Sequence, residues 1–428
     1  MKLDAEMIVD DMNGRTALQG DVVFDFRKRF SVRRTQEAGT SSLVFRDSLS
    51  PASACCIGDT AFHVDTKAQR LQALRMFMPP CVAPAPLYVR NLPDSAADIH
   101  FWQFPAITEK LAFENHATLG RDTDGEGNEA PVQTYLGLPW ATYIDTQCVP
   151  DIVKQVFRVR LQGYRALASA WGLEWGHDIR IHTVCQHIYW QALLPVFSEI
   201  GVTDLHLSHC EPASGVVAQR YGVRVHSWSL AAPNIVNPAR RTGLETGRKP
   251  AARNKLASFV GAHMPHYRSD IRLRLKEEAA RTDEPDLVYE LTSDWHFNPV
   301  VYDMQVKGKT LSSVQLDRER DATARYNTLL SDSVFSLCPE GAGPNTLRLW
   351  ESLAAGAIPV VIVDDWLWPA PPEGSPRWED AVIVLRRNEV AGVFERLRRL
   401  RQSEPVRLER MQSAGRILYE GFCQKCCF

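Results

Sequence analysis

Features that would place a protein in a membrane or outside the cell are missing from this sequence. The N-terminus, MKLDAEMIVDDMNG, has acidic residues in its first turns and lacks the basic segment and apolar run of a signal peptide. The longest uninterrupted apolar stretch, residues 353–363, contains Gly and Pro and is shorter than the ~18 residues that span a bilayer. The ten cysteines are scattered along the chain, unlike a disulfide framework. These absences predict a cytoplasmic protein with no transmembrane helix.

The sequence also has little excess charge of either sign. It carries 49 basic and 51 acidic residues, which argues against a protein that coats the phosphates of nucleic acid. A local concentration of arginine falls in a predicted amphipathic helix that could rest on an anionic membrane surface, although a plain solvated face is the commoner explanation. Three C-terminal cysteines lack a second ligand pair at metal spacing, so an ordinary tail is favoured over a zinc or lipid role. The arginines are Arg396, Arg398, Arg399 and Arg401, and the cysteines are Cys423, Cys426 and Cys427.

Length and composition predict a globular protein of more than one domain. The chain has 428 residues, of which 45% are hydrophobic and 23% charged, so it holds enough apolar material for two or three cores. Residues 1–80 alternate short apolar pieces with turn formers and predict no particular fold. A Pro-, Gly- and Arg-rich stretch without periodicity, residues 230–254, is typical of a linker between domains.

Strands and helices are expected to alternate on both sides of that linker. Such alternation indicates parallel sheets covered by helices, and ligands bind these sheets at the carboxyl ends of the strands. Before the linker, strands are predicted at 135–144, 179–183, 204–208 and 223–228, with helices at 151–171, 188–200 and 216–221. After it, strands at 255–260, 287–291 and 334–337 alternate with helices at 270–280 and 325–330.

The segment SVFSLCPEGAGPNTLRLWESLAAGAIPVVIVDDW, residues 333–366, predicts a strand, a Gly-rich turn, a helix and a second strand. Gly341 and Gly343 allow a tight turn, and Asn345 or Thr346 is available to cap the helix. Gly356 suits the left-handed end of a helix. A helix that begins behind such a turn presents unpaired amides and the positive end of its dipole. The segment therefore predicts a phosphate or pyrophosphate site.

Two charged residues lie on one face of this predicted helix. Arg348 and Glu351 are three positions apart and are therefore neighbours on its surface. The guanidinium can pair with a phosphate through two donors, and the carboxylate can accept hydrogen bonds from both hydroxyls of a ribose. A surface ion pair between the two residues is the ordinary alternative. The Gly-rich turn just before them favours a nucleoside diphosphate.

The segment resembles the signature of the exostosin-like family of inverting glycosyltransferases. Residues 253–261, RNKLASFVG, resemble the basic strand that opens the family's donor domain, and Trp378 matches a tryptophan after the Ile-Pro-Val strand. The sequence departs from the family at Asn345 and Thr346, where many members carry Ser, and at Ala357, where Cys is common. The likeness covers about residues 250–400. The matching positions are Ser333, Phe335, Leu337, Pro339, Gly341, Arg348, Glu351, Ala355, Gly356, Ile358, Pro359 and Val360.

The resemblance implies an α/β GT-B fold, in which two Rossmann-like domains face each other across a cleft. Residues 1–240 would bind the acceptor, residues 250–400 would bind the nucleotide sugar, and residues 401–428 would form a C-terminal helix or tail. The expected donor is a UDP-sugar and the expected acceptor is a glycan or glycolipid. The resemblance implies a bacterial-type enzyme that builds a surface polysaccharide from the cytoplasmic side. It is compatible both with a free enzyme and with one that binds the membrane surface. The implied donor-site residues are Arg253, Gly261, Gly341, Gly343, Asn345, Thr346, Arg348 and Glu351.

Inverting transfer needs a general base for the acceptor hydroxyl and positive charge for the leaving diphosphate. The helix N-terminus with Arg348 and Arg253 can supply that charge, so no metal ion or other cofactor is expected to be required. Polar side chains at the ends of the N-terminal strands are the candidates for the base. A single histidine in such a position is more often structural. We rank His187 and Asp145 first, with His182, His209 and Glu211 behind them.

Other interpretations compete with this one. Asp122 and Asp124 supply the Asp-x-Asp of a metal-dependent transferase, but no apolar strand precedes them, which favours a solvated loop. The same stretch is a poor calcium loop, because Gln133 stands where a bidentate Glu is expected. A dehydrogenase is disfavoured, because no Gly-x-Gly-x-x-Gly follows an early strand. A non-catalytic protein of the same fold that binds sugar nucleotides or glycans is compatible with the sequence.

Overall fold

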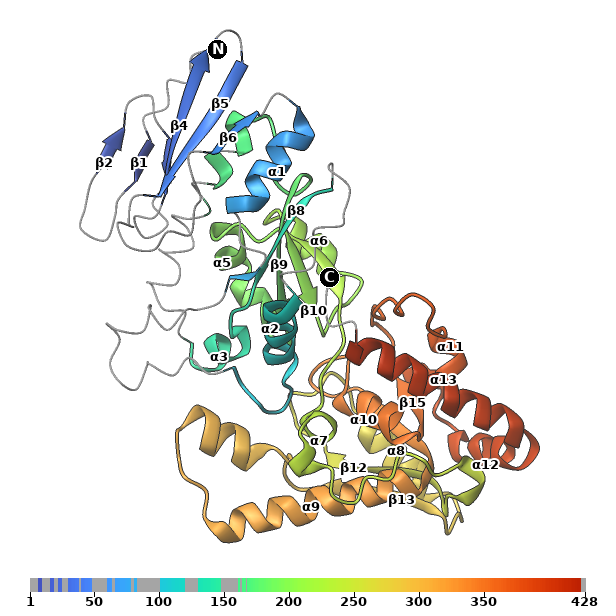
Figure 1. Cartoon of the computed structure of the whole chain (residues 1–428). Helices are drawn as coiled ribbons and strands as arrows, with labels where there is room; N and C mark the ends of the chain where they lie inside the picture. Colours follow the sequence, from blue (N-terminus) through green and yellow to red (C-terminus); the bar gives the residue numbers. More distant parts are fainter. Residues whose placement is uncertain are drawn as a thin grey trace.

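The computed structural model contains two Rossmann-like units, each built on a five-stranded parallel sheet (Figure 1). It describes residues 66–77, 101–119, 130–147, 161, 164–166 and 168–424, together with the backbone of seven strands between residues 7 and 82. The predicted fold class, α/β with two Rossmann-like units, is confirmed. None of the described helices is both long enough and apolar enough to cross a membrane.

The sheet of the N-terminal unit has the strand order β11-β10-β9-β8-β7, and its neighbouring strands are parallel. Apolar side chains of these strands pack into one cluster, in which Ile181 and Leu205 are fully buried. The strands are β7 (Cys81–Val82), β8 (Val132–Leu136), β9 (Ile179–Cys185), β10 (Asp204–Leu207) and β11 (Arg224–Ser227). The helices include α2 (Thr108–Leu119), α3 (Trp140–Asp145), α5 (Leu194–Glu199) and α6 (Ser214–Gln219).

Two predicted elements of this unit differ in the structure. The stretch 135–144 is not one strand, because Gly137 and Pro139 interrupt the extended backbone and a short helix, α3, follows β8. The stretch 188–200 is a single 3-10 turn followed by α5. Most of the predicted helix 151–171 lies outside the described residues.

Residues 7–63 carry strands that the sequence did not predict. Four of them form an antiparallel sheet in the order β3-β4-β5-β6, and β1 pairs with β2. Helix α1 (Lys67–Phe77) follows this sheet and contacts β8 of the N-terminal unit. The strands are β1 (Met7–Val9), β2 (Thr16–Leu18), β3 (Val22–Phe24), β4 (Phe30–Glu37), β5 (Thr40–Asp47) and β6 (Thr60–His63).

The sheet of the C-terminal unit has the strand order β13-β12-β14-β15-β16, again parallel throughout. Helix α10 ends at Gly356, which adopts the predicted left-handed conformation with φ of 72°. The strands are β12 (Lys255–Ala262), β13 (Leu287–Thr292), β14 (Ser333–Pro339), β15 (Ile358–Ile362) and β16 (Ile383–Leu385). The helices are α8 (Ile271–Ala280), α9 (Ser313–Asp332), α10 (Leu347–Ala355), α11 (Trp378–Ala381), α12 (Val393–Ser403) and α13 (Pro405–Gln424), with a π-helix at Pro299–Val306.

The segment predicted as a linker and the segment predicted as a C-terminal helix or tail are both packed parts of the C-terminal unit, and the second forms helix α13. The linker contains helix α7 (Pro233–Val236), and its Arg240 forms an ion pair of 2.5 Å with Glu319 of α9. Helix α13 lies against α10 and α11, where Phe422 contacts the ring of Trp350 (Figure 1). Both segments therefore hold α10 in place.

The arginine face of α12 has acidic partners inside the protein. Arg398 pairs with Glu284 at 3.6 Å, and Arg401 pairs with Asp286 at 3.6 Å. Arg399 contacts Glu395 on its own helix at 3.8 Å. These contacts agree with the solvated-face interpretation and give no support to a membrane contact.

One face of the N-terminal sheet carries a cluster of histidines. Nδ1 of His182 lies 3.1 Å from Nε2 of His206, whose ring stacks on His226 at 4.8 Å. Nε2 of His226 lies 2.8 Å from the carboxylate of Asp204. Among the described residues, no group of His, Cys, Asp and Glu has the arrangement of a metal site. His182 and His206 are therefore a polar part of the core under α2, which contributes His116, while His226 lies at the exposed edge of the cluster.

Acid is expected to destabilise the N-terminal unit through this cluster. Burial lowers the pKa of His182 and of His116 to about 4 each, while these imidazoles titrate near pH 6.5 in an unfolded chain. Between those values the unfolded chain binds more protons, so stability is full above about pH 6.5 and falls as the pH drops toward 4. Urea unfolding at pH 7 and pH 5 measures the effect. An unchanged midpoint would contradict it.

Candidate functional site

The Gly-rich turn after β14 leads into a helix that no side chain caps. Thr346 occupies the N-cap position in an extended conformation, but it forms no capping bond, and its buried Oγ1 has no partner among the described residues. Asn345 does not cap the helix either. Its Nδ2 donates to the carbonyl of Ser208 at 2.9 Å, and its Oδ1 accepts from Nε1 of Trp350 at 2.9 Å. The side chains therefore leave the first turn of α10 open to an acceptor from outside.

Gly343 lets this turn touch the N-terminal unit. A Cβ atom at Gly343 would lie 2.3 Å from Nδ1 of His209, a distance that real atoms do not adopt. His209 follows β10 and is held against the turn, where burial lowers the pKa of its imidazole to about 3. The turn at the carboxyl end of one sheet thus faces the carboxyl end of the other.

Two guanidinium groups gather behind this turn. Arg348 lies 4.2 Å from the ring centre of Phe259 on β12, and Arg272 of α8 lies 5.4 Å from the same ring. Arg348 donates to the carbonyl of Val260, and its Nη1 is buried without a partner in the described part of the chain. Neither guanidinium forms an ion pair with a described carboxylate. Positive charge is therefore concentrated here without a direct carboxylate contact from the described residues.

Arg272 was not predicted from the sequence. It donates to the carbonyls of Ala262, Glu340 and Pro339 at 2.6, 3.2 and 3.4 Å, and its guanidinium lies 4.6 Å from the ring centre of Tyr267. Burial lowers the pKa of Arg272 to about 10, so the group stays charged near neutral pH. It lies beside the Gly-rich turn, since a Cβ atom at Gly341 would be 2.9 Å from Nη2 of Arg272.

Gly261 also lies close to these charges. A Cβ atom there would lie 3.2 Å from Nη2 of Arg348 and 3.2 Å from the ring of Phe259. The structure thus brings together Gly261, Gly341, Gly343, Asn345, Thr346 and Arg348 of the predicted donor-site residues.

Glu351 lies near this group but is occupied by protein partners. Its Oε1 accepts from Nδ2 of Asn234 at 2.8 Å, and its Oε2 accepts from the hydroxyl of Tyr326 at 2.7 Å. The Tyr326 hydroxyl also accepts from Nε of Arg348 at 3.3 Å. Glu351 is only 4% exposed. In this position Glu351 orients Arg348 through the hydroxyl of Tyr326. This role differs from the expected one, in which the Glu351 carboxylate accepts hydrogen bonds from a ribose.

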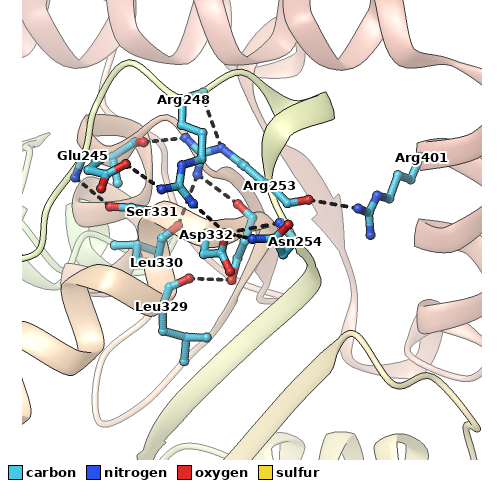
Figure 2. A network of polar contacts seen from close by, with 11 residues as sticks. Glu245, Arg248, Arg253, Asn254, Leu329, Leu330, Ser331, Asp332 and Arg401 are labelled. Atoms are coloured by element: carbon cyan, nitrogen blue, oxygen red, sulfur yellow. Dashed lines mark hydrogen bonds and ion pairs between the residues drawn. The ribbon is translucent and has the colours of Figure 1, made fainter.

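Arg253 lies at the opposite end of the sheet, where it belongs to a network of polar contacts (Figure 2). It precedes β12, whose carboxyl end carries the site, and its guanidinium is 1% exposed. It donates to four backbone carbonyls, those of Arg248, Leu330, Ser333 and Ala355. This position gives Arg253 a structural role at the amino edge and separates it from the other predicted donor-site residues.

A buried carboxylate links the turn to the N-terminal unit. Glu340 accepts bonds from Ser269 at 2.6 Å and from Nε of Arg387 at 2.6 Å. Nε of Arg268 lies 3.3 Å from the same carboxylate, and its Nη1 pairs with Glu211 of the N-terminal unit. Glu340 was missed from the sequence, where the motif letters Pro-Glu-Gly are the signal for it.

The two first-ranked base candidates form a pair. Nε2 of His187 lies 3.1 Å from Oδ1 of Asp145, and Nε1 of Trp102 donates to Oδ2 of Asp145 at 2.9 Å. The backbone N–H of Tyr189 donates to Nδ1 of His187 at 3.1 Å. The sequence ranked these two residues as separate candidates, and the structure places them in contact at the carboxyl edge of the N-terminal sheet.

The other base candidates are placed elsewhere. His182 lies in the middle of β9 within the histidine cluster, so it does not reach Asp145 and His187 at the edge of the sheet. His209 and Glu211 face the C-terminal unit. The competing Asp-x-Asp at residues 122–124 lies outside the described residues.

Glu109 was also missed from the sequence. It is 1% exposed, and its carboxylate accepts from the backbone N–H groups of Ala141 and Gln186, each at 3.1 Å from its nearer oxygen. Burial raises the pKa of Glu109 to about 8, although these amides oppose the shift. It thereby connects the start of α3 with the turn that precedes His187.

Parts of the chain are similar to known glycosyltransferases. Residues 213–400 match the model of the exostosin GT47 domain. The chain is 28% identical over 108 residues to the Exostosin-1 homolog of Caenorhabditis elegans, covering 25% of this chain and 27% of that protein. It is 38% identical over 72 residues to the probable glucuronoxylan glucuronosyltransferase IRX7 of Arabidopsis thaliana, covering 17% of this chain and 16% of that protein.

A third relative and a solved structure are also similar to this chain. The probable glucuronosyltransferase Os03g0107900 of Oryza sativa subsp. japonica is 26% identical over 181 residues, covering 42% of this chain and 37% of that protein. The pneumococcal O-GlcNAc transferase GtfA, in complex with UDP and GlcNAc, aligns with 98% of this chain and 67% of its own, at 9% identity and a TM-score of 0.35. The chain thus matches less than half the length of each curated relative. The family match supports the predicted resemblance to exostosin-like glycosyltransferases.

A methyl group at Gly343 is expected to disturb the contact between the units. Gly343→Ala would force His209 or the turn aside, at a cost of roughly 1–3 kcal/mol in the free energy of unfolding. Gly247→Ala is the control, because a Cβ atom at Gly247 meets nothing within 4 Å. Thermal unfolding of the two variants gives the comparison. A Gly343→Ala protein as stable as the control would show that the contact is absent in solution.

Proposed function

We propose that this protein is a glycosyltransferase that binds a nucleotide-diphosphate sugar at the Gly-rich turn and transfers the sugar to a glycan or glycolipid. The observation that supports the proposal most is the pair of charged guanidiniums, Arg272 and Arg348, beside the uncapped N-terminus of α10. Buried cations without a carboxylate partner are costly, and a diphosphate would neutralise them. The match of residues 213–400 to the exostosin GT47 domain agrees with this use.

The same groups suit the leaving diphosphate in an inverting reaction. As the bond from the anomeric carbon to the phosphate oxygen breaks, negative charge grows on the diphosphate. The two guanidiniums and the uncapped amides of α10 lie beside the turn and would stabilise that charge. We therefore propose a metal-independent reaction that takes place in the cytoplasm, with the N-terminal unit holding the acceptor.

The donor is proposed to be a UDP-sugar, and UDP-glucuronic acid is the first to test. Two of the curated relatives are named probable glucuronosyltransferases, which motivates the choice of sugar. The expected product is a surface polysaccharide of a bacterial-type cell.

Loss of either guanidinium is expected to weaken nucleotide binding. Arg272→Ala and Arg348→Ala should each lower the affinity for UDP by about 10-fold to 100-fold, because a charge-assisted bond contributes roughly 1.5–3 kcal/mol. Arg274→Ala is the matched control, since Arg274 lies two positions after Arg272 and therefore on the opposite side of helix α8. Calorimetry with UDP, on variants with native circular dichroism, measures the change. Equal affinities for all three variants would contradict the proposed site.

Removal of divalent ions is expected to leave the activity intact. Release of UDP from the UDP-sugar that is turned over fastest should change less than about two-fold after dialysis against EDTA, because the guanidiniums supply the charge. A loss of activity that Mg²⁺ or Mn²⁺ restores would contradict the metal-independent mechanism.

A further inference from the structure

Three of the five predicted base candidates have other roles in the structure. His182 contacts His206 inside the sheet. His209 lies against the backbone of Gly343, and its lowered pKa of about 3 makes its imidazole a weak proton acceptor. Glu211 is paired with Arg268. None of these side chains is free to receive a proton from an acceptor hydroxyl.

His187 is also committed, and its hydrogen bonds define which nitrogen carries the proton. The backbone N–H of Tyr189 donates to Nδ1, so Nδ1 holds the lone pair of the neutral ring. Nε2 must then carry the proton, which it donates to Oδ1 of Asp145. Both nitrogens of His187 are occupied, and the ring acts on the carboxylate of Asp145.

Asp145 retains accepting capacity and lies where an acceptor sugar would approach. Each carboxylate oxygen accepts one hydrogen bond and keeps a second lone pair, and the side chain is 24% exposed. The π-helix of the C-terminal unit that carries Tyr302 is joined to the segment beside Asp145, because Gln305 accepts from the backbone N–H groups of Gln103 and Phe104 at 2.8 and 2.9 Å. Tyr189 is 59% exposed and Tyr302 is 46% exposed, so both rings are available for a sugar to pack on. Asp145 and His209 both follow strands that end at the carboxyl edge of the N-terminal sheet, and His209 contacts the Gly-rich turn at Gly343, so this edge lies beside the proposed diphosphate site.

We infer that Asp145 is the general base of the transfer reaction and that His187 is the residue that positions it, an inference that rests on the proposed function. The Asp145 carboxylate takes the proton of the acceptor hydroxyl while that oxygen forms a bond to the anomeric carbon. The bond from the anomeric carbon to the phosphate oxygen breaks, and its electron pair leaves with the diphosphate. Tyr189 and Tyr302 flank the acceptor ring.

The experiment compares transfer and binding in Asp145→Asn, which keeps the size of the side chain and removes the proton acceptor. The kcat for the UDP-sugar that the wild type turns over fastest is expected to fall about 100-fold to 10,000-fold, while the Kd for UDP stays within about two-fold. Asp303→Asn is the matched control, because Asp303 is 33% exposed and its ion pairs within the described part of the chain are with Lys307 and Lys309. Its kcat should equal that of the wild type.

The outcomes separate this inference from the proposed function. If Asp145→Asn binds UDP normally and keeps more than a tenth of the wild-type kcat, Asp145 is not the base, while the transferase proposal stands. If the wild type binds no nucleoside diphosphate and releases UDP from no UDP-sugar, the proposed function fails and the assignment of Asp145 fails with it.

The pH profile tests the positioning role of His187. His187→Ala removes a donor that favours the charged carboxylate, so the acidic limb of the kcat profile should move to higher pH. His187→Gln offers an amide donor near the position of Nε2 and should restore the wild-type limb. An unmoved limb in His187→Ala would show that His187 serves only the structure of the turn.

Discussion

The site depends on two positive charges that form no direct ion pair with a described carboxylate. Arg272 and Arg348 are held by backbone carbonyls, by Tyr326 and by the ring of Phe259. These partners fix the guanidiniums without neutralising them, and burial of unneutralised cations costs free energy unless an anion completes the arrangement. Glu351 could have formed an ion pair with Arg348, but its oxygens are directed to Asn234 and Tyr326. The charge therefore remains available for a ligand.

The absence of a side chain at Gly343 determines how close the second unit can come. His209 occupies the space that a Cβ atom would need, while Asn345 reaches the backbone of Ser208. Arg268 adds an ionic link, because it lies between Glu340 on the turn and Glu211 on the N-terminal unit. A group at the carboxyl edge of one sheet can thus act on a ligand held at the edge of the other.

The sequence predicted those parts of the site that lie close together along the chain. The turn, the left-handed Gly356 and Arg348 belong to one segment, and local rules of capping and spacing are enough to identify them. Arg272 comes from another helix, and nothing in its local sequence shows that it meets Phe259. Arg253 was assigned to the site because of a resemblance, although a residue that precedes a strand lies at the amino end of the sheet. The predicted strand at 255–260 was therefore enough to place Arg253 away from the carboxyl end that holds the site.

Asp145 and His187 illustrate how a short helix can hold a reactive group. Helix α3 has six residues, too few to be stable from its own hydrogen bonds. Glu109 accepts the amide of Ala141 at the start of α3 and the amide of Gln186 beside His187, so one buried carboxyl group fixes both partners. Trp102 then fixes the other oxygen of Asp145. The distance between Asp145 and His187 is consequently determined by Glu109, a residue 36 positions before Asp145 in the chain.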